Sequence, residues 1–445
     1  MKIKTPAEYG KVLGDFLLDK IVTILFVVCV VAGFCLCPGI TFNFFINDLA
    51  ARFFRNGFLV LSLIIPVIAG LGMNFGIVVG AIAGMLAIII VRFIGVGGLP
   101  GILLCALIAL PLAILFGIAT GKLYNNTRGQ EMIASLIVGY FASGLYQFIG
   151  LFVIGVIIPV AASHPLVQPG GIGLNATIDM GVHPTRIKNP ALQTPGLTYA
   201  LDWIWRVPFV PALITVASCM LCYLVIRYVM AKRDPASDGV KTWTFVLKCF
   251  ICAALVAVGV YGLAVPDSIL SQVRELPAVT GAVIVILCLF INYFTKTKLG
   301  QDCRSVGQSQ HIAKISGIDV DRTRIIATVI STVLASWGMI IYLQNMGTLS
   351  TFTAHQQIGL FSVASLLVGG ATTSKANVKN ALIGIILFNS MAIVSTEIGV
   401  LFFPGNTGVG EFFRSFTVYG VIGLALGLYV WKDRKAAENK EAPGS

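Results

Sequence analysis

The sequence predicts an all-α polytopic membrane protein with about ten to twelve transmembrane helices. Hydrophobic residues make up 57% of its 445 residues and charged residues only 11%, whereas soluble domains carry about 25% charged residues. The mean hydropathy is +0.91, and long apolar runs recur along the chain. A soluble fold could not bury this much apolar surface, so the composition excludes one.

Twelve apolar runs are long enough to be considered as membrane spans. They cover residues 21–39, 57–73, 75–94, 100–120, 132–160, 207–230, 246–264, 277–295, 324–344, 357–370, 381–402 and 415–431. The first run follows a polar start and lacks a small-residue cleavage site, which predicts an uncleaved signal anchor. The run at 357–370 is short and ends in glycines, which also fits a re-entrant segment.

The distribution of basic residues predicts that both termini lie in the cytoplasm. With the N-terminus inside and all twelve runs crossing, eight of the 31 Lys and Arg residues lie outside, and the other 23 lie inside. Basic residues accumulate on the cytoplasmic side of membrane proteins. The outer group includes Arg52, Arg55, Arg186 and Lys188. The net charge of +12 reflects this topology, and we do not expect nucleic-acid binding from it.

This topology divides the chain into three parts. They are a cytoplasmic N-terminal segment at 1–20, a transmembrane domain at 21–431 and a cytoplasmic tail at 432–445. The transmembrane domain contains an external loop at 162–206 and a polar cytoplasmic segment at 296–323. The external loop is rich in Pro and Gly. It either binds an external partner or is a long connecting loop without a partner.

Glycine-containing breaks interrupt apolar runs in both halves of the chain. The two stretches are IAGLGMNFGIVVGAIAG at 68–84 and LVGGATTSKANVKNALIGIIL at 367–387. Broken helices at corresponding places of two halves are typical of transport pathways, although small residues are common in membrane helices generally. The pattern predicts a pathway near the axis that relates the halves.

No motif for catalysis is present in the sequence. It lacks G-x-x-x-x-G-K-[ST] and H-E-x-x-H, and its four histidines are scattered. The Cys219/Cys222 and Cys249/Cys252 pairs lie in apolar runs, which favours buried apolar cysteines over a metal site. We therefore expect no catalytic residue, no bound metal and no cofactor.

Neutral polar residues in the spans are the candidates for a translocation pathway. We single out Asn74, Gln147 and Asn389, although such amides more often join helices than bind substrate. Glu131 and Glu397 lie near predicted span ends, and the sequence shows no Asp/Glu/His relay of the kind that ion-coupled carriers use. A pathway lined by amides and hydroxyls predicts an uncharged, polyhydroxylated solute.

The polar stretch GQDCRSVGQSQHIAKISGIDVDR, residues 300–322, predicts a short capped helix. Ser309 can cap it, and Gly317 can end it in the left-handed conformation. Its small apolar face consists of Ile312, Ala313 and Ile315. Two helical turns are not stable alone in water, so we expect this helix to dock on the bilayer interface or on another protein.

This stretch resembles the cytoplasmic coupling motif of permease subunits of bacterial ABC importers, the group that includes ribose/monosaccharide, branched-chain amino acid and nucleoside permeases. The pattern is R-S-V-G-Q-S-x-x-x-A-x-x-S-G-I-D-V-D-R, ending at Arg322. Three further stretches are similar to family motifs in the same order, namely NFGIVVGA at 74–81, GQEMIASLIVGYFAS at 129–143, and LVGG at 367–370 with ALIG at 381–384. The first of them lacks the Asp-Leu-Ser that the family has there.

The resemblance implies a type II ABC importer-like permease in the bacterial inner membrane, paired with a second permease subunit as a homo- or heterodimer. A separate cytoplasmic ABC ATPase would bind the ATP. The residues expected to couple the two are Gly307 and Gly317, which would set the helix angles, Ser309 as the cap, and Ile312, Ala313 and Ile315, which would enter a groove of the ATPase.

The resemblance also implies an extracytoplasmic substrate-binding protein, with a monosaccharide or a nucleoside as the main solute candidates. Two alternatives stay open at this point. The chain could be a stand-alone secondary transporter or channel, and the short helix could be an interfacial amphipathic helix without a partner.

Overall fold

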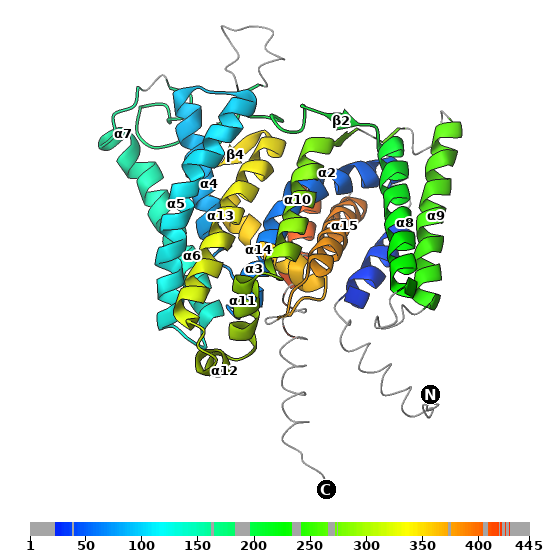
Figure 1. Cartoon of the computed structure of the whole chain (residues 1–445). Coiled ribbons are helices and arrows are strands. Elements are labelled where there is room, and N and C mark those ends of the chain that lie inside the picture. Colours follow the sequence, from blue (N-terminus) through cyan, green and yellow to red (C-terminus); the bar gives the residue numbers. More distant parts are fainter. Residues whose placement is uncertain are drawn as a thin grey trace.

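The structure is a computed structural model that describes residues 23–37, 40–161, 164–182, 196–233, 242–265, 272–273, 275–372, 375–403 and 408–417, with a few single positions up to 427. The described chain is mainly helical, and its strands are only two or three residues long (Figure 1), which confirms the prediction of an all-α polytopic membrane protein. The segments predicted at 1–20 and 432–445 lie outside the described residues.

An N-terminal helix at Thr23–Leu36 is followed by the labelled elements of Figure 1. The first half contains α2 (Phe42–Ser62), α3 (Ile64–Ile68), α4 (Ile77–Ile94), α5 (Gly98–Asn126), α6 (Glu131–Phe148), the π-helix η1 (Ile149–Val153), α7 (Ile154–Val156) and β1 (Thr177–Asp179). The second half contains β2 (Arg206–Val207), α8 (Phe209–Arg233), α9 (Thr242–Ala264), β3 (Leu276–Pro277), α10 (Ala278–Phe294), α11 (Lys298–Gln308), α12 (Gln310–Ile315), α13 (Val320–Met346), β4 (Thr348–Ser350), α14 (Ala354–Val368) and α15 (Val378–Phe402).

Within the described residues, seven helices are long and apolar enough to cross a membrane, and α10 with α11 forms an eighth candidate that is bent by 72°. Three shorter apolar helices, Thr23–Leu36, Lys248–Ala264 and Ala354–Val368, accompany them. The predicted run at 415–431 lies largely outside the described residues.

The predicted span at 57–73 is wrong at both ends. Helix α2 already begins at Phe42, and the apolar run is divided between α2 and α3. The hydropathy pattern missed the first half of α2 because charged residues interrupt it. Two of these charges compensate each other, since Arg52 Nε donates to Asp48 Oδ2 at 2.9 Å one turn away.

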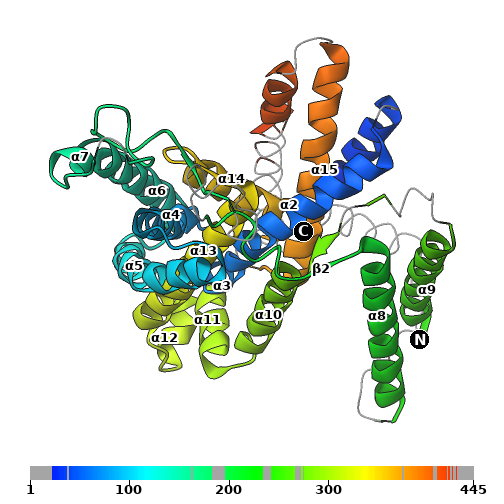
Figure 2. The same cartoon turned by 90° about the horizontal axis from the view of Figure 1, so that it is seen from above.

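Helix α13 is the central helix of the bundle and packs against α2, α4 and α5 (Figure 2). Glycines on α4 and α5 face its backbone. A Cβ atom on Gly84 would lie 2.5 Å from the carbonyl oxygen of Ser336, and one on Gly117 would lie 2.8 Å from the Cα atom of Val329. Small residues of this kind allow membrane helices to approach each other closely.

Both predicted glycine breaks are present. Helix α3 ends at Ile68 and α4 begins at Ile77, while α14 ends at Val368 and α15 begins at Val378. In each break a glycine takes a positive φ, +75° at Gly70 and +84° at Gly370, which favours glycine over other residues.

The described parts of the loop that was predicted to be external, residues 162–206, are attached to the helical bundle. Strand β1 pairs antiparallel with β4 directly after α13, and β2 pairs with β3 directly before α10. Between them, the buried carboxylate of Asp202 accepts hydrogen bonds from Thr280, from Gln344 Nε2 at 2.9 Å and from Asn345 Nδ2 at 2.7 Å. These contacts join the loop to the ends of α10 and α13.

Helices α8 and α9 form a hairpin at the periphery of the molecule, where they pack mainly on each other (Figure 2). Their exposed side chains are largely apolar, for example Val216 and Phe250.

We predict that Gly84→Val destabilises the protein, because its side chain cannot fit against the Ser336 carbonyl without separating α4 from α13. The cost should be similar to that of overpacking a core, about 1–3 kcal/mol. Thermal unfolding of the purified protein in detergent measures it. Gly144→Ala on α6 is the matched control, because a Cβ there meets no atom within 4 Å; equal unfolding temperatures for the two variants would contradict the prediction.

Candidate functional site

The predicted capped helix is present as α12. Ser309 Oγ accepts a hydrogen bond from the backbone N–H of Ile312 at 3.3 Å, as expected for an N-cap. At the other end Gly317 has a φ of +79°, and the Ile318 N–H donates to the Ala313 carbonyl at 3.0 Å. Both ends of this six-residue helix are therefore closed by local hydrogen bonds.

Ala313 faces the protein interior, which corrects the expectation that it would enter a partner's groove. Its side chain is 1% exposed and packs with Val306 of α11 and Val320 of α13. Ala313 therefore attaches α12 to the rest of the protein.

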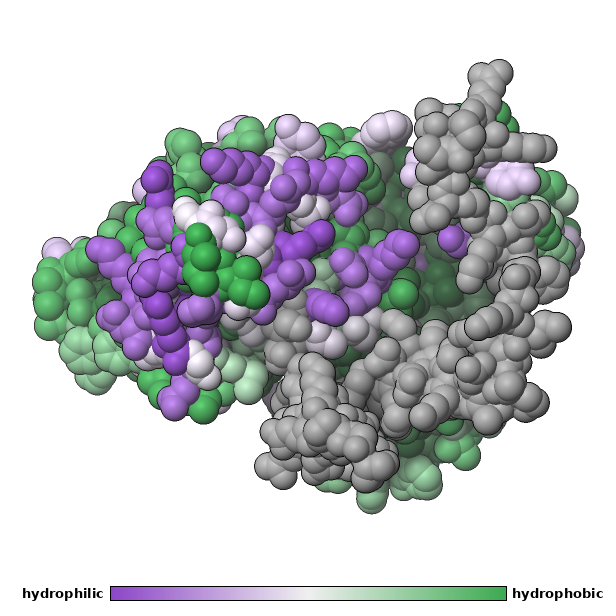
Figure 3. Space-filling model, turned by 60° about the horizontal axis from the view of Figure 1, so that its bottom comes forward, coloured by the Kyte–Doolittle hydropathy of each residue, from purple (hydrophilic) through white to green (hydrophobic). Residues whose placement is uncertain are grey.

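Ile312 and Ile315 face away from the protein, as predicted. They are 65% and 75% exposed, and α12 lies at the lower end of the molecule in Figure 1. Figure 3 views this face and shows a small hydrophobic patch surrounded by hydrophilic residues. Both isoleucines are therefore accessible to a partner or to the bilayer interface.

Gly307 allows α11 to pack closely against the break after α3. We had predicted that it would set the angle of the coupling helix. In α11 its backbone lies against the break that follows α3, where a Cβ on Gly70 would be 2.7 Å from the Gly307 Cα atom. A Cβ on Gly307 would collide with the Ile68 carbonyl oxygen. The polar segment is thus in direct contact with the end of the α2–α3 span.

A buried ion pair joins the start of α13 to the start of α6. Arg324 is fully buried, and its Nη2 donates to Glu131 Oε1 at 2.7 Å and to the Tyr124 carbonyl at 3.2 Å. Its other two nitrogens, Nε and Nη1, make no hydrogen bond in the described structure. Glu131 is therefore the charge that compensates the buried guanidinium.

The same region holds Asn74. Its side-chain oxygen accepts hydrogen bonds from the Tyr124 hydroxyl at 2.8 Å and from the Gly76 N–H at 2.9 Å. Asn74 is 2% exposed, so it fixes the start of α4. The residues around the described cavities do not include it.

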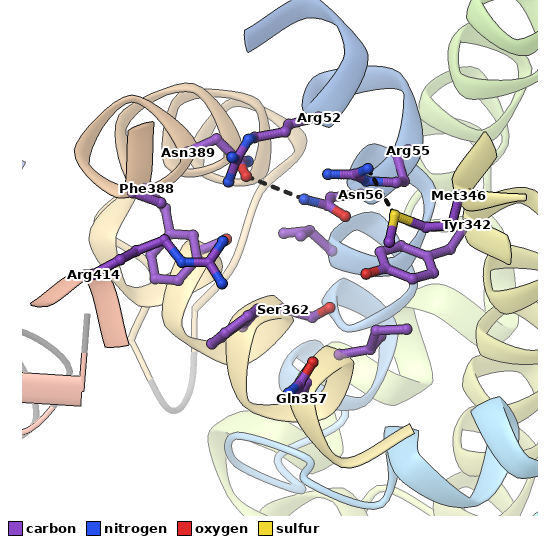
Figure 4. A pocket seen from close by; sticks show the side chains of 15 residues that line it. Arg52, Arg55, Asn56, Tyr342, Met346, Gln357, Ser362, Phe388, Asn389 and Arg414 are labelled. Atoms are coloured by element: carbon purple, nitrogen blue, oxygen red, sulfur yellow. Dashed lines mark hydrogen bonds between the residues drawn. The ribbon is translucent and has the colours of Figure 1, made fainter. Parts of the chain in front are cut away.

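A cavity of about 190 Å³ lies between α2, α13, α14 and α15, at the end of α13 that is opposite α12 (Figure 4). Its polar lining consists of Arg52, Arg55, Asn56, Tyr342, Gln357, Ser362, Ser365, Asn389 and Arg414. Asn56 Nδ2 donates to Asn389 Oδ1 at 3.1 Å across the cavity.

Of the three predicted pathway residues, Asn389 lines this cavity. Gln147 lies on α6, where its amide nitrogen is 3.3 Å from both Ser143 Oγ and the Phe352 carbonyl oxygen, and Asn74 lies in the break before α4. The structure does not bring the three residues together.

Arg52, Arg55 and Arg414 were not predicted to belong to this site. The first two were placed in an external loop because the helix was expected to begin after them. Their spacing of three residues was a usable signal, since it places two cations on one face of a helix.

Comparisons with known proteins agree with the resemblance. A family model described as branched-chain amino acid transport system / permease component matches residues 196–422, half of the chain. The nucleoside ABC transporter permease protein NupC of Lactococcus lactis is 30% identical over 36% of this chain and 47% of its own length. The xylose transport system permease protein XylH of Haemophilus influenzae is 30% identical over 35% of this chain and 38% of its own.

A second permease of L. lactis, NupB, is 32% identical over 29% of this chain and 33% of its own length. The matches thus span less than half of the length of each of these relatives. No solved structure matches the chain significantly.

We predict that Glu131→Gln destabilises the protein by about 3–5 kcal/mol, because it leaves the buried charge of Arg324 without a counter-charge. Chemical or thermal unfolding of the purified protein measures the loss. The matched control is Arg128→Gln, which breaks the exposed ion pair with Asp321 and should cost about 1 kcal/mol or less. A Glu131→Gln protein no less stable than this control would show that the pair is not structural.

Proposed function

The chain belongs to the permease-component family of ABC transport systems, and we propose that it forms the membrane pathway of an importer for a small polar solute. A separate cytoplasmic ABC ATPase supplies the energy by hydrolysing ATP. Monosaccharides and nucleosides are the leading solute classes, because the relatives are a xylose permease and two nucleoside permeases.

The observation that carries this proposal is the geometry of α12. The helix is too short to be stable alone, yet it is closed at both ends, attached through Ala313, and displays two exposed isoleucines. Burying two such side chains in a partner's groove is favourable by about 1.5–3 kcal/mol each. This arrangement is suited to a rigid contact, through which a partner protein can displace α12 together with the helices to which it is attached.

Two routes connect α12 to the cavity. One runs along α13, which begins five residues after α12 and contributes Tyr342 and Met346 to the cavity. The other runs through α11, whose Gly307 lies against the α3 end of the span that carries Arg55. A displacement of α12 by the ATPase would thereby reach two walls of the cavity.

We propose two further partners. A second permease subunit, identical or homologous, would complete the membrane domain, and an extracytoplasmic binding protein would deliver the solute. The loop parts at 164–182 and 196–206 are suited to receive the binding protein, because strand pairing and the Asp202 hydrogen bonds fix them to α10 and α13.

We predict that Ile315→Asp abolishes binding of the ATPase, because a charge replaces an apolar side chain at the centre of the docking surface. A tagged chain is expressed in its host and purified, and a P-loop ATPase should accompany the wild type but not the variant. The matched control is Ile172→Asp, a substitution at an exposed isoleucine of the external loop. If Ile315→Asp retains the ATPase, the docking assignment is wrong.

We also predict that solute uptake by proteoliposomes containing the complete complex requires ATP on the side of the ATPase. A proton or sodium gradient alone should support no uptake above background. Uptake that is driven by an ion gradient without ATP would instead support a secondary transporter, the alternative class for this chain.

A further inference from the structure

We propose that the cavity between α2, α13, α14 and α15 binds an oxyanion, so that the transported solute is a hydroxylated molecule carrying a carboxylate or a phosphate group. This inference rests on the proposed function, and it replaces the uncharged solute that the sequence predicted with an anionic derivative of a sugar or related polyol. It starts from the charges of the cavity lining, which includes three arginines and, among the described residues, no acidic side chain.

Two of these arginines have carboxylate partners outside the lining. Arg52 pairs with Asp48 at 2.9 Å, and Arg414 pairs with Glu411 at 2.6 Å. These pairs are locally neutral, and they leave Arg55 as the uncompensated charge.

Arg55 has no ion-pair partner within 4.0 Å among the described residues. Its Nη1 lies 2.8 Å from the Met346 sulfur, which is a weak acceptor, and its guanidinium lies 5.5 Å from the centre of the Tyr342 ring. The Nε atom is buried and makes no hydrogen bond. Arg55 lines the cavity (Figure 4), and no carboxylate among the described residues lies within 4.0 Å to compensate its charge.

The position of Arg55 in the membrane makes this arrangement costly without a ligand. It lies within the span Phe42–Ile68, and an ionised side chain inside a span generally marks a substrate or ion pathway.

The other residues that line the cavity would bind the uncharged, hydroxylated part of the solute. Asn56, Asn389, Gln357 and Ser362 are neutral donors and acceptors around the same cavity, and Phe361 and Phe388 give it apolar surface. Arginine binds carboxylates and phosphates through two parallel hydrogen bonds, and amides and hydroxyls bind sugar hydroxyls. The combination fits a sugar acid or a sugar phosphate better than a neutral sugar.

The test measures ligand-induced thermal stabilisation of the full-length protein in nanodiscs of phosphatidylcholine, which carries no net charge. The probes are ribose 5-phosphate, ribonate and ribose. We expect the two anionic probes to raise the unfolding temperature saturably, with an apparent Kd at least tenfold below that of ribose. Sodium chloride at matched ionic strength should not reproduce the effect.

Arg55→Gln should weaken binding of both anionic probes at least tenfold and should remove their advantage over ribose. Arg55→Lys, which keeps the charge but loses the planar pair of donors, should weaken it at least threefold and serves if the glutamine variant does not fold. Arg128→Gln, far from the cavity beside the start of α13, should bind like the wild type.

Equal affinity for ribose and its anionic derivatives, or anion binding that is insensitive to both Arg55 variants, would overturn the proposal. Nanodiscs containing phosphatidylglycerol distinguish a lipid headgroup from a solute. If that lipid alone gives the Arg55-dependent stabilisation and prevents binding of ribose 5-phosphate, the oxyanion comes from the membrane and the solute assignment is wrong. None of these measurements uses the ATPase, so their outcome is independent of the Ile315→Asp experiment.

Discussion

The close backbone contact of α13 with α4 and α5 is the constraint on which the rest of the structure depends. Lipid supplies no hydrophobic force that drives helices together, so membrane helices associate through packing and hydrogen bonds. Here glycines such as Gly84 and Gly117 bring two neighbours against the α13 backbone, and Ser331 Oγ adds a hydrogen bond to the Ser62 carbonyl of α2. With 27 residues, α13 is about 40 Å long, and these contacts lie along its middle part.

Helix α13 connects the region of α12 with the cavity. At its first turn Asp319 caps α13, and Arg324 is anchored by Glu131; at its last turns Tyr342 and Met346 form a cavity wall, and Gln344 and Asn345 hold the buried Asp202. The contact of α11 with the α3 end supplies a second connection to α2. Arg55 lies on α2 and touches Met346 on α13, so a relative movement of the two helices would change the arrangement of its donors.

Local signals made the short helix predictable, whereas the site in the membrane depends on contacts between distant segments. The Ser309 cap, the Gly317 terminator and the exposed isoleucines are all encoded within nine residues, and the structure shows each of them. The inward position of Ala313 was not predictable, because Val306 and Val320 meet it only after α11 and α13 have packed. The pairing of Glu131 with Arg324 likewise joins residues 193 positions apart, which a single sequence cannot reveal.

The amides chosen from the sequence and the arginines found in the cavity differ in what their burial costs. An amide inside a span can donate its hydrogen bond to a backbone carbonyl, as Asn389 Nδ2 does to the Ile385 carbonyl at 2.7 Å. The presence of such an amide therefore says little about a ligand. A guanidinium has five donors and a full charge, and Met346 together with the face of Tyr342 compensates only part of them in Arg55. Because these contacts leave its charge without a carboxylate partner among the described residues, Arg55 is a stronger indication of the solute than the neutral residues around it.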